Sequence, residues 1–238
     1  MAKKDSNSHI ACEHCVLDNI CKPIAVGEHS FDQINNILDR RQPLLAGEHL
    51  YKKGDSLSSI YALTSGTVKL IQSNRKGNEQ VVGFRFPGEL LGDEAISSKT
   101  HLLNAMAVDD ISVCKIPMKG LDDIAKIVPA FQRNLIELLS HQCNTLHQQF
   151  ASYAARNNAD ERLAAFILNV LNRSKNEISQ AHEIFLAMSR DDIANYLGLR
   201  RETLSRTLSK FQKMNIINRQ NKALEIIDLD HLRILAND

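Results

Sequence analysis

Residues 189–214 restrict the fold more than any other part of the sequence, because they describe two helices joined by a tight turn. Ser189, followed by an aspartate three residues later, is typical of the capping pair that begins a helix, and it precedes an apolar repeat over 191–197. Gly198 supplies the turn, and residues 201–214 have the apolar spacing of a second helix. This arrangement predicts a helix-turn-helix.

Positive charge is concentrated around the second of these helices. The chain carries a formal net charge of only +1, yet residues 200–222 contain seven basic side chains and one acidic side chain. Such a local excess in a near-neutral protein is typical of nucleic-acid binding. The alternative is a pair of interaction helices with a solvated basic surface.

The side chains that face outward from the second helix have the chemistry to read DNA. Arginine can donate two hydrogen bonds to guanine, glutamate can accept one from cytosine, and serine can contact several base edges. Two strand-like segments, 216–219 and 223–227, follow and predict a wing that brings basic side chains to phosphates. The predicted DNA-binding residues are Arg201, Glu202, Ser205, Arg206, Lys210, Arg219 and Lys222.

Residues 49–117 show a different pattern, in which apolar side chains recur with a period of two. Glycines interrupt it at short intervals, which predicts short antiparallel strands in a small barrel or roll. The fold class we expect is therefore α+β, with an N-terminal antiparallel β-roll joined by a long helix to a winged helix-turn-helix. The predicted segments are 1–30 (cysteine-rich), 31–128 (roll), 129–156 (long helix) and 157–238 (DNA-binding domain).

The long helix is predicted to start at Pro129 and to run for about 25 residues, of which only Arg133 and Glu137 are charged. Its apolar residues form one broad stripe, so we expect it to pack on its own domain or on a second copy of the chain. No acidic residue lies between Glu137 and Asp160, which predicts dimerisation even without a cofactor. The predicted dimer interface comprises Leu135, Leu139, Leu146, Phe150 and Tyr153. Three polar residues interrupt the stripe, namely Gln142, His147 and Gln149.

Three of the five cysteines, Cys12, Cys15 and Cys21, fall within ten residues, and Cys114 lies in a strand-like segment. The sequence shows neither a secretion signal nor the roughly 18 to 20 apolar residues that cross a bilayer, so we expect a cytoplasmic protein with no membrane partner. Crowded thiols in a reducing compartment indicate a metal or redox centre. Four thiolates suit either zinc or an iron–sulfur cluster, and their spacing does not choose between the two. We expect Cys143, in the long helix, to be a packing cysteine.

The order of these parts resembles the CRP/FNR superfamily of bacterial transcription regulators over essentially the whole chain. Residues 202–206, Glu-Thr-Leu-Ser-Arg, match the Glu-x-x-Ser-Arg recognition motif of the FNR (fumarate and nitrate reduction regulator) family. Residues 160–166 and 195–199 are similar to other signatures of that family. The resemblance implies a roll of the cyclic-nucleotide-binding type, a homodimer that pairs through the long helix, and RNA polymerase as a partner.

The same resemblance implies an oxygen-labile [4Fe-4S] cluster, because that family has this N-terminal cysteine spacing and one distant cysteine before an Ile-Pro pair. The implied ligands are Cys12, Cys15, Cys21 and Cys114. It further implies an oxygen-responsive regulator that binds palindromic double-stranded DNA of TTGAT type under anaerobic conditions. The CRP branch instead reads TGTGA, and it does so through an arginine placed like Arg201. We expect Arg201 to contact a phosphate and not a base, because Arg200 beside it makes the whole start of the helix basic.

Three other classes of function are alternatives to this one. A cyclic-nucleotide receptor needs a cation for the buried phosphate, yet residues 93–110 contain no arginine, and Thr-His-Leu-Leu-Asn occupies 100–104, where an Arg-Ser pair is expected. A zinc-stapled DNA-binding protein without a sensing role uses the same cysteines. An enzyme is not expected, since the sequence has no Walker loop, GxSxG or His-Glu-x-x-His motif.

Overall fold

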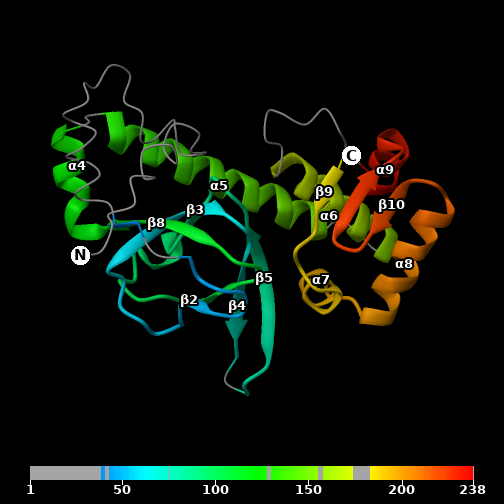
Figure 1. Cartoon of the computed structure of the whole chain (residues 1–238), viewed down its shortest axis with the longest axis horizontal. Coiled ribbons are helices and arrows are strands. Elements are labelled where there is room, and N and C mark those ends of the chain that lie inside the picture. Colours follow the sequence, from blue (N-terminus) through cyan, green and yellow to red (C-terminus); the bar gives the residue numbers. More distant parts are fainter. Residues whose placement is uncertain are drawn as a thin grey trace, which may run out of the picture. The chain divides into compact units, whose positions relative to one another are not determined.

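The computed structural model describes residues 39–40, 43–74, 76–127, 130–154, 158–173 and 183–237. The chain divides into two compact units, Met1–Leu70 with Arg85–Gln142 and Ile71–Phe84 with Cys143–Asp238. The predicted cluster-binding segment 1–30, with Cys12, Cys15 and Cys21, lies outside the described residues. Figure 1 follows the order of elements along the chain.

Two four-stranded sheets make up the β-structure of residues 39–117, in the orders β1-β8-β3-β6 and β2-β7-β4-β5. The first contains β1 (Asp39–Arg40), β8 (Ser112–Pro117), β3 (Ser59–Ser65) and β6 (Leu90–Leu91). The second contains β2 (His49–Tyr51), β7 (Asn104–Ala107), β4 (Val68–Ser73) and β5 (Glu79–Arg85). Neighbouring strands of the first sheet are antiparallel.

The turn between β3 and β4 shows why the period-two pattern is interrupted by glycine. Gly66 has φ 78°, which an L side chain rarely adopts. A Cβ at this position would lie 2.5 Å from the carbonyl oxygen of Asp110. The Asp109 carboxylate accepts a hydrogen bond from the Thr67 amide at 2.6 Å and fixes the turn beside it.

The core of the roll is completed by two helices that cover the first sheet, α4 (Leu121–Ile127) and α5 (Ala130–Ala154). Figure 1 shows α4 and the start of α5 next to β3 and β8. The buried cluster comprises Ile60, Ala62, Leu90, Ile116, Ile124 and Phe131. Because the cluster draws on strands and helices alike, β3 is buried along most of its length rather than at alternate positions.

The residues of α5 divide into a buried and an exposed set. Leu135 and Leu139, both predicted in the dimer interface, are partly buried against the roll core. Leu146 and Phe150, from the same predicted set, are 38% and 76% exposed. The fifth, Tyr153, lies in α5, but its side chain falls outside the described part of the chain.

Gln142 joins α5 to the roll by three hydrogen bonds. Its Oε1 accepts from the Leu90 amide at 3.1 Å, and its Nε2 donates to the Leu90 carbonyl at 3.2 Å and to the Asp93 carboxylate at 3.0 Å. Burial raises the pKa of Asp93, and the positive charge of Arg85 opposes this shift. Gln142 and Gln149, which are predicted to interrupt the apolar stripe of α5, are both buried, and Gln149 donates to Asn169 at 3.1 Å.

Replacing Gln142 with alanine should destabilise the protein, because the Leu90 amide and the Asp93 carboxylate lose buried partners. We expect the free energy of unfolding, measured in urea, to fall by about 1–3 kcal/mol. Gln148→Ala, at an exposed position of the same helix, is the control and should change it by less than about 0.5 kcal/mol. Equal losses in both variants would show that the three hydrogen bonds do not hold α5.

The C-terminal unit is built on α6 (Ala159–Arg173), whose apolar face is buried as its sequence pattern predicts. The buried residues include Leu163, Phe166, Ile167, Val170 and Leu171. The remaining elements are β9 (Glu183–Phe185), α7 (Arg190–Leu197), α8 (Arg201–Lys213), β10 (Ile217–Gln220), β11 (Ala223–Ile226) and α9 (Leu229–Ala236). The three strands form an antiparallel sheet in the order β10-β11-β9.

Candidate nucleic-acid interface

Local hydrogen bonds fix both ends of α7. The Ser189 hydroxyl accepts from the Asp192 amide at 3.0 Å, which is the capping interaction expected from the sequence. At the other end Gly198 adopts a left-handed conformation with φ 64°, and its N–H donates to carbonyls of the last turn. The chain then turns and enters α8 at Arg201, as predicted.

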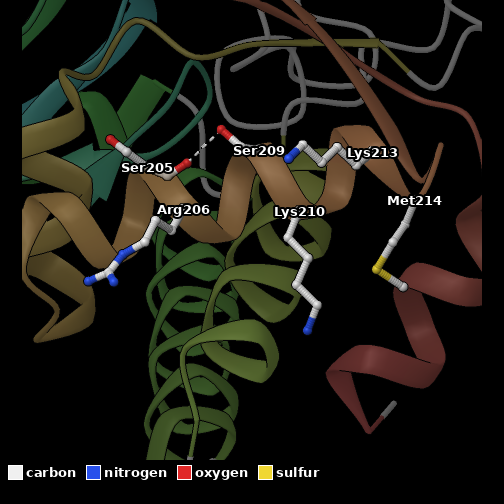
Figure 2. A pocket seen from close by; sticks show the side chains of 6 residues that line it. All are labelled: Ser205, Arg206, Ser209, Lys210, Lys213 and Met214. Carbon is white, nitrogen blue, oxygen red and sulfur yellow. Dashed lines mark hydrogen bonds between the residues drawn. The ribbon is translucent and has the colours of Figure 1, made fainter.

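The second helix separates its buried and exposed residues by the helical period. Leu204, Thr207, Leu208 and Phe211 are buried, and they hold α8 to the C-terminal unit. The opposite side forms a hollow lined by Ser205, Arg206, Ser209, Lys210, Lys213 and Met214 (Figure 2). Arg206 and Lys210, one turn apart, extend to the same side of α8 in that view. This outer face therefore presents cations and hydroxyls together.

Two of the predicted DNA-binding cations are held by carboxylates. Arg201 lies 3.2 Å from Asp191 of α7, and Lys210 forms an ion pair with Asp160 of α6. The Arg201 and Asp191 side chains are each 63% exposed, so their pair contributes at most about 1 kcal/mol. A phosphate can displace such a carboxylate at little cost.

The wing is a tight hairpin between β10 and β11, in which Gln220 pairs with Ala223. Asn221 at its tip has φ 56°, a conformation that asparagine tolerates better than most residues. Lys222 lies 5.9 Å from the ring centre of Phe185, a cation–π distance. Lys222 and Arg219, both predicted to contact DNA, thus lie on one short hairpin.

Arg190 is a basic residue of this surface that sequence reasoning missed. Its Nη1 lies 3.5 Å from the Ser205 hydroxyl, and its charge helps to lower the pKa of Arg219, although burial of Arg219 is the larger cause. Arg219 also has a buried Nη1 without a hydrogen-bond partner among the described residues. A cation that is incompletely bonded and lies within the influence of a second positive charge favours an anion as its partner. The sequence feature that points to Arg190 is its position in the first turn of α7, where the helix dipole disfavours a cation.

Asn195 has a structural role that the sequence did not reveal. Its side-chain oxygen accepts from the Val81 amide at 2.7 Å, and its side-chain nitrogen donates to the Glu79 carbonyl at 3.1 Å. Its own carbonyl accepts from Gln80 at 2.5 Å. Asn195 therefore anchors α7 to β5 within the C-terminal unit.

Truncating Asn195 to alanine should expose the Val81 amide to water. We expect hydrogen–deuterium exchange at Val81 to become about tenfold faster, which corresponds to the loss of about 1.4 kcal/mol. Gln212→Ala, at an exposed position of α8, should leave that exchange rate unchanged. An unaltered rate in Asn195→Ala would mean that this anchor does not persist in solution.

The one predicted cluster ligand that the structure describes is Cys114, in β8. It pairs with Arg40 of β1 on one side and with Ala62 of β3 on the other. Its side chain is partly buried against the core cluster of the roll, the same cluster that Leu135 and Leu139 of α5 contact. Among the described residues, no three or more His, Cys, Asp or Glu side chains are arranged to hold a metal ion.

Polar side chains inside the roll bond to one another. The buried His101 lies 3.1 Å from the Glu94 carboxylate and stacks on Tyr51 with ring centres 3.8 Å apart. Burial, with the charge of Glu94, raises the pKa of Tyr51, whose hydroxyl accepts from the Gly92 amide at 3.0 Å. The buried Arg85 donates to the Leu90 carbonyl at 3.3 Å.

No helix in the described part of the chain is both long and apolar enough to cross a membrane.

Comparison with known families agrees with both halves of this description. Residues 41–127 match the cyclic nucleotide-binding domain, and residues 161–235 match the Crp-like helix-turn-helix domain. The structure of FixK2 from Bradyrhizobium japonicum is similar, with a TM-score of 0.72 and 27% identity over 83% of this chain and 97% of that chain. These matches define a DNA-binding transcription regulator with a CRP/FNR fold, and not an enzyme.

Two relatives narrow this class. The chain is 40% identical to the anaerobic regulatory protein of Haemophilus influenzae over 94% of this chain and 86% of that protein. It is 38% identical to the fumarate and nitrate reduction regulatory protein of Escherichia coli over 95% of this chain and 90% of that protein. The chain belongs to the fumarate and nitrate reduction regulator family of anaerobic transcription regulators. The predicted fold class, a β-roll with a long helix and a C-terminal winged helix-turn-helix, is confirmed.

Proposed function

We propose that this protein is an oxygen-responsive transcription regulator that binds a [4Fe-4S] cluster through Cys12, Cys15, Cys21 and Cys114. In the proposed active form it is a cytoplasmic homodimer, paired through α5, that binds palindromic DNA of TTGAT type and contacts RNA polymerase. In this proposal the chain consists of a cluster-binding segment (1–30), a roll (31–128), a dimerisation helix (129–156) and a DNA-binding domain (157–238).

The position of Cys114 is the observation that carries the cluster assignment. β1 places Arg40 opposite Cys114, so the chain that carries the other three cysteines enters the described structure beside the fourth. Cys21 is 18 residues before Asp39, and a chain of that length reaches up to about 60 Å, so all four thiolates are able to converge. A donor set of four thiolates fits an iron–sulfur cluster.

When bound, the cluster supplies a group that oxygen alters. The residues around Cys114 connect this change to α5 through shared packing. The Cys114 side chain and the first turns of α5 pack on one buried cluster. Because packed cores respond to small shifts as a unit, the state of the Cys114 thiolate biases how α5 lies on the roll. Pairing of α5 then sets the spacing of the two recognition helices on the two half-sites.

Single serine substitutions test this assignment. Cys114→Ser, or the same change at Cys12, Cys15 or Cys21, should remove iron and sulfide from anaerobically purified protein and abolish its anaerobic DNA binding. Cys143→Ser is the matched control and should keep its iron and sulfide. Unchanged iron in Cys114→Ser would remove that residue from the ligand set, and colourless protein that contains zinc would instead support the zinc-stapled alternative.

We further propose that the residues of the DNA surface divide into base readers and phosphate contacts. Arg206 on the outer face of α8, with Glu202 and Ser205, forms the base-reading group. Arg201, at the start of α8, and Arg190, beside Ser205, are phosphate contacts. The wing residues Arg219 and Lys222, together with Lys210, belong to this second group.

Binding measured over a range of salt concentrations separates the two groups. Arg206→Ala should cost about 1–3 kcal/mol at its guanine and relax specificity there. Arg201→Ala and Arg190→Ala should weaken all sequences alike and reduce the slope of log K against log salt by about 0.9 each. Gln212→Ala serves as the control. If TGTGA outcompetes TTGAT in a selection on randomised half-sites, Arg201 is a base reader and this division is wrong.

The interior of the roll gives no support to a cyclic-nucleotide effector. The buried Arg85 bonds to Leu90 and lies close enough to Asp93 to affect its pKa. His101 is bonded to Glu94 and stacked on Tyr51. A cyclic phosphate that binds Arg85 would need this cation to leave its present partner.

A further inference from the structure

Four of the exposed residues of α5 are apolar, and these four form a narrow stripe whose spacing resembles a coiled-coil seam. Ile136, Cys143 and Phe150 are seven residues apart, and Leu146 lies between the last two. All four side chains are exposed, Ile136 to 65% and Phe150 to 76%. Alternating steps of three and four residues place a stripe on the axis between two parallel helices. This geometry rests on the proposed dimer, and in it Cys143 faces its own copy across the two-fold axis.

Cys143 has a second potential metal ligand beside it. Its Sγ lies 4.0 Å from Nε2 of His147, one helical turn further on. A tetrahedral zinc ion, with bonds of about 2.3 Å to sulfur and about 2.0 Å to nitrogen, holds two such atoms about 3.5 Å apart. The two atoms therefore need to approach by only a few tenths of an ångström to share one ion. The sequence predicts that Cys143 is a packing cysteine, but within one chain its side chain is exposed.

We propose that Cys143 and His147 of two copies of the chain together bind one zinc ion at the dimer seam. Each chain supplies one thiolate and one imidazole, and the two-fold axis completes the four ligands of a Cys₂His₂ site. Two thiolates balance the charge of Zn²⁺, and their two protons pass to solvent on binding. Thiolate and imidazole ligands select zinc over magnesium or calcium.

Metal bound only by the dimer strengthens pairing through mass action. Zinc at the α5 seam is therefore a second factor that strengthens dimerisation, separate from the N-terminal cysteines. Occupancy of the seam would stabilise the DNA-binding form without contacting DNA.

Sedimentation of the full-length chain, cluster-free and with a thiol-free reductant, tests the site. In wild-type protein we expect about 10 μM zinc, compared with EDTA, to lower the dimer dissociation constant by about tenfold or more. Cys143→Ala and His147→Gln should each abolish this zinc effect. His141→Gln, on the same helix, should retain it.

Cobalt substitution gives a second readout. Wild-type dimer should bind one more cobalt ion per dimer than Cys143→Ala does, with the visible absorption of tetrahedral sulfur–nitrogen coordination. A zinc effect that survives in both Cys143→Ala and His147→Gln, or none in wild type, overturns the proposed site.

Leu146→Asp distinguishes failure of the metal site from failure of the dimer on which it rests. This change puts like charges into the seam, so the dimer seen in EDTA should be lost. A dimer that is sensitive to Leu146→Asp but indifferent to zinc overturns the zinc site alone. A dimer that Leu146→Asp leaves intact overturns pairing through α5, and with it both proposals.

Discussion

One face of α5 is buried by the roll, and a stripe along the same helix is left exposed. The proposed functions of the protein depend on this division. Leu135, Leu138 and Leu139 pack on the roll core, and Gln142 satisfies the backbone of Leu90 from the same helix. Phe150 and Ile136, on the stripe, remain mostly in contact with solvent. Exposed apolar surface of this kind, regularly spaced along a helix, is available to a second copy of the chain in the proposed dimer. The proposed sensing and DNA-binding functions both depend on that pairing.

The DNA-binding surface follows the same principle of two faces with opposite chemistry. α8 buries Leu204 and Phe211 and turns its cations outward, where Asp191 and Asp160 form ion pairs with two of them. In the free protein, burial and, to a smaller extent, the charge of Arg190 lower the pKa of Arg219, and one of its buried guanidinium nitrogens has no hydrogen-bond partner among the described residues, which is costly. In the proposed complex a DNA phosphate offsets that cost. The surface is therefore organised for an anionic partner in advance of binding.

The roll shows how a domain with a cyclic-nucleotide-binding fold can serve another signal. Arg85, His101 and Tyr51 are engaged inside it by neighbouring polar groups, so its interior is stabilised without a ligand. The proposed signal instead reaches the roll from its edge, where β1 pairs with β8 at Cys114. This edge and α5 share one hydrophobic core, which gives the two ends of the proposed response a physical connection.

The sequence by itself determined the elements that depend on local chemistry. The Ser189 cap, the Gly198 turn and the outward face of α8 follow from spacing and residue type, because a helix places its side chains by a fixed period. Tertiary structure alone decided which polar residues are structural. Gln142 and Asn195 bond to strands that are about 50 and 115 residues away in sequence, and no periodicity encodes a contact between segments so distant. Nor does the sequence pattern show that the charge of Arg190 acts on Arg219, because only the folded chain brings the two within electrostatic range.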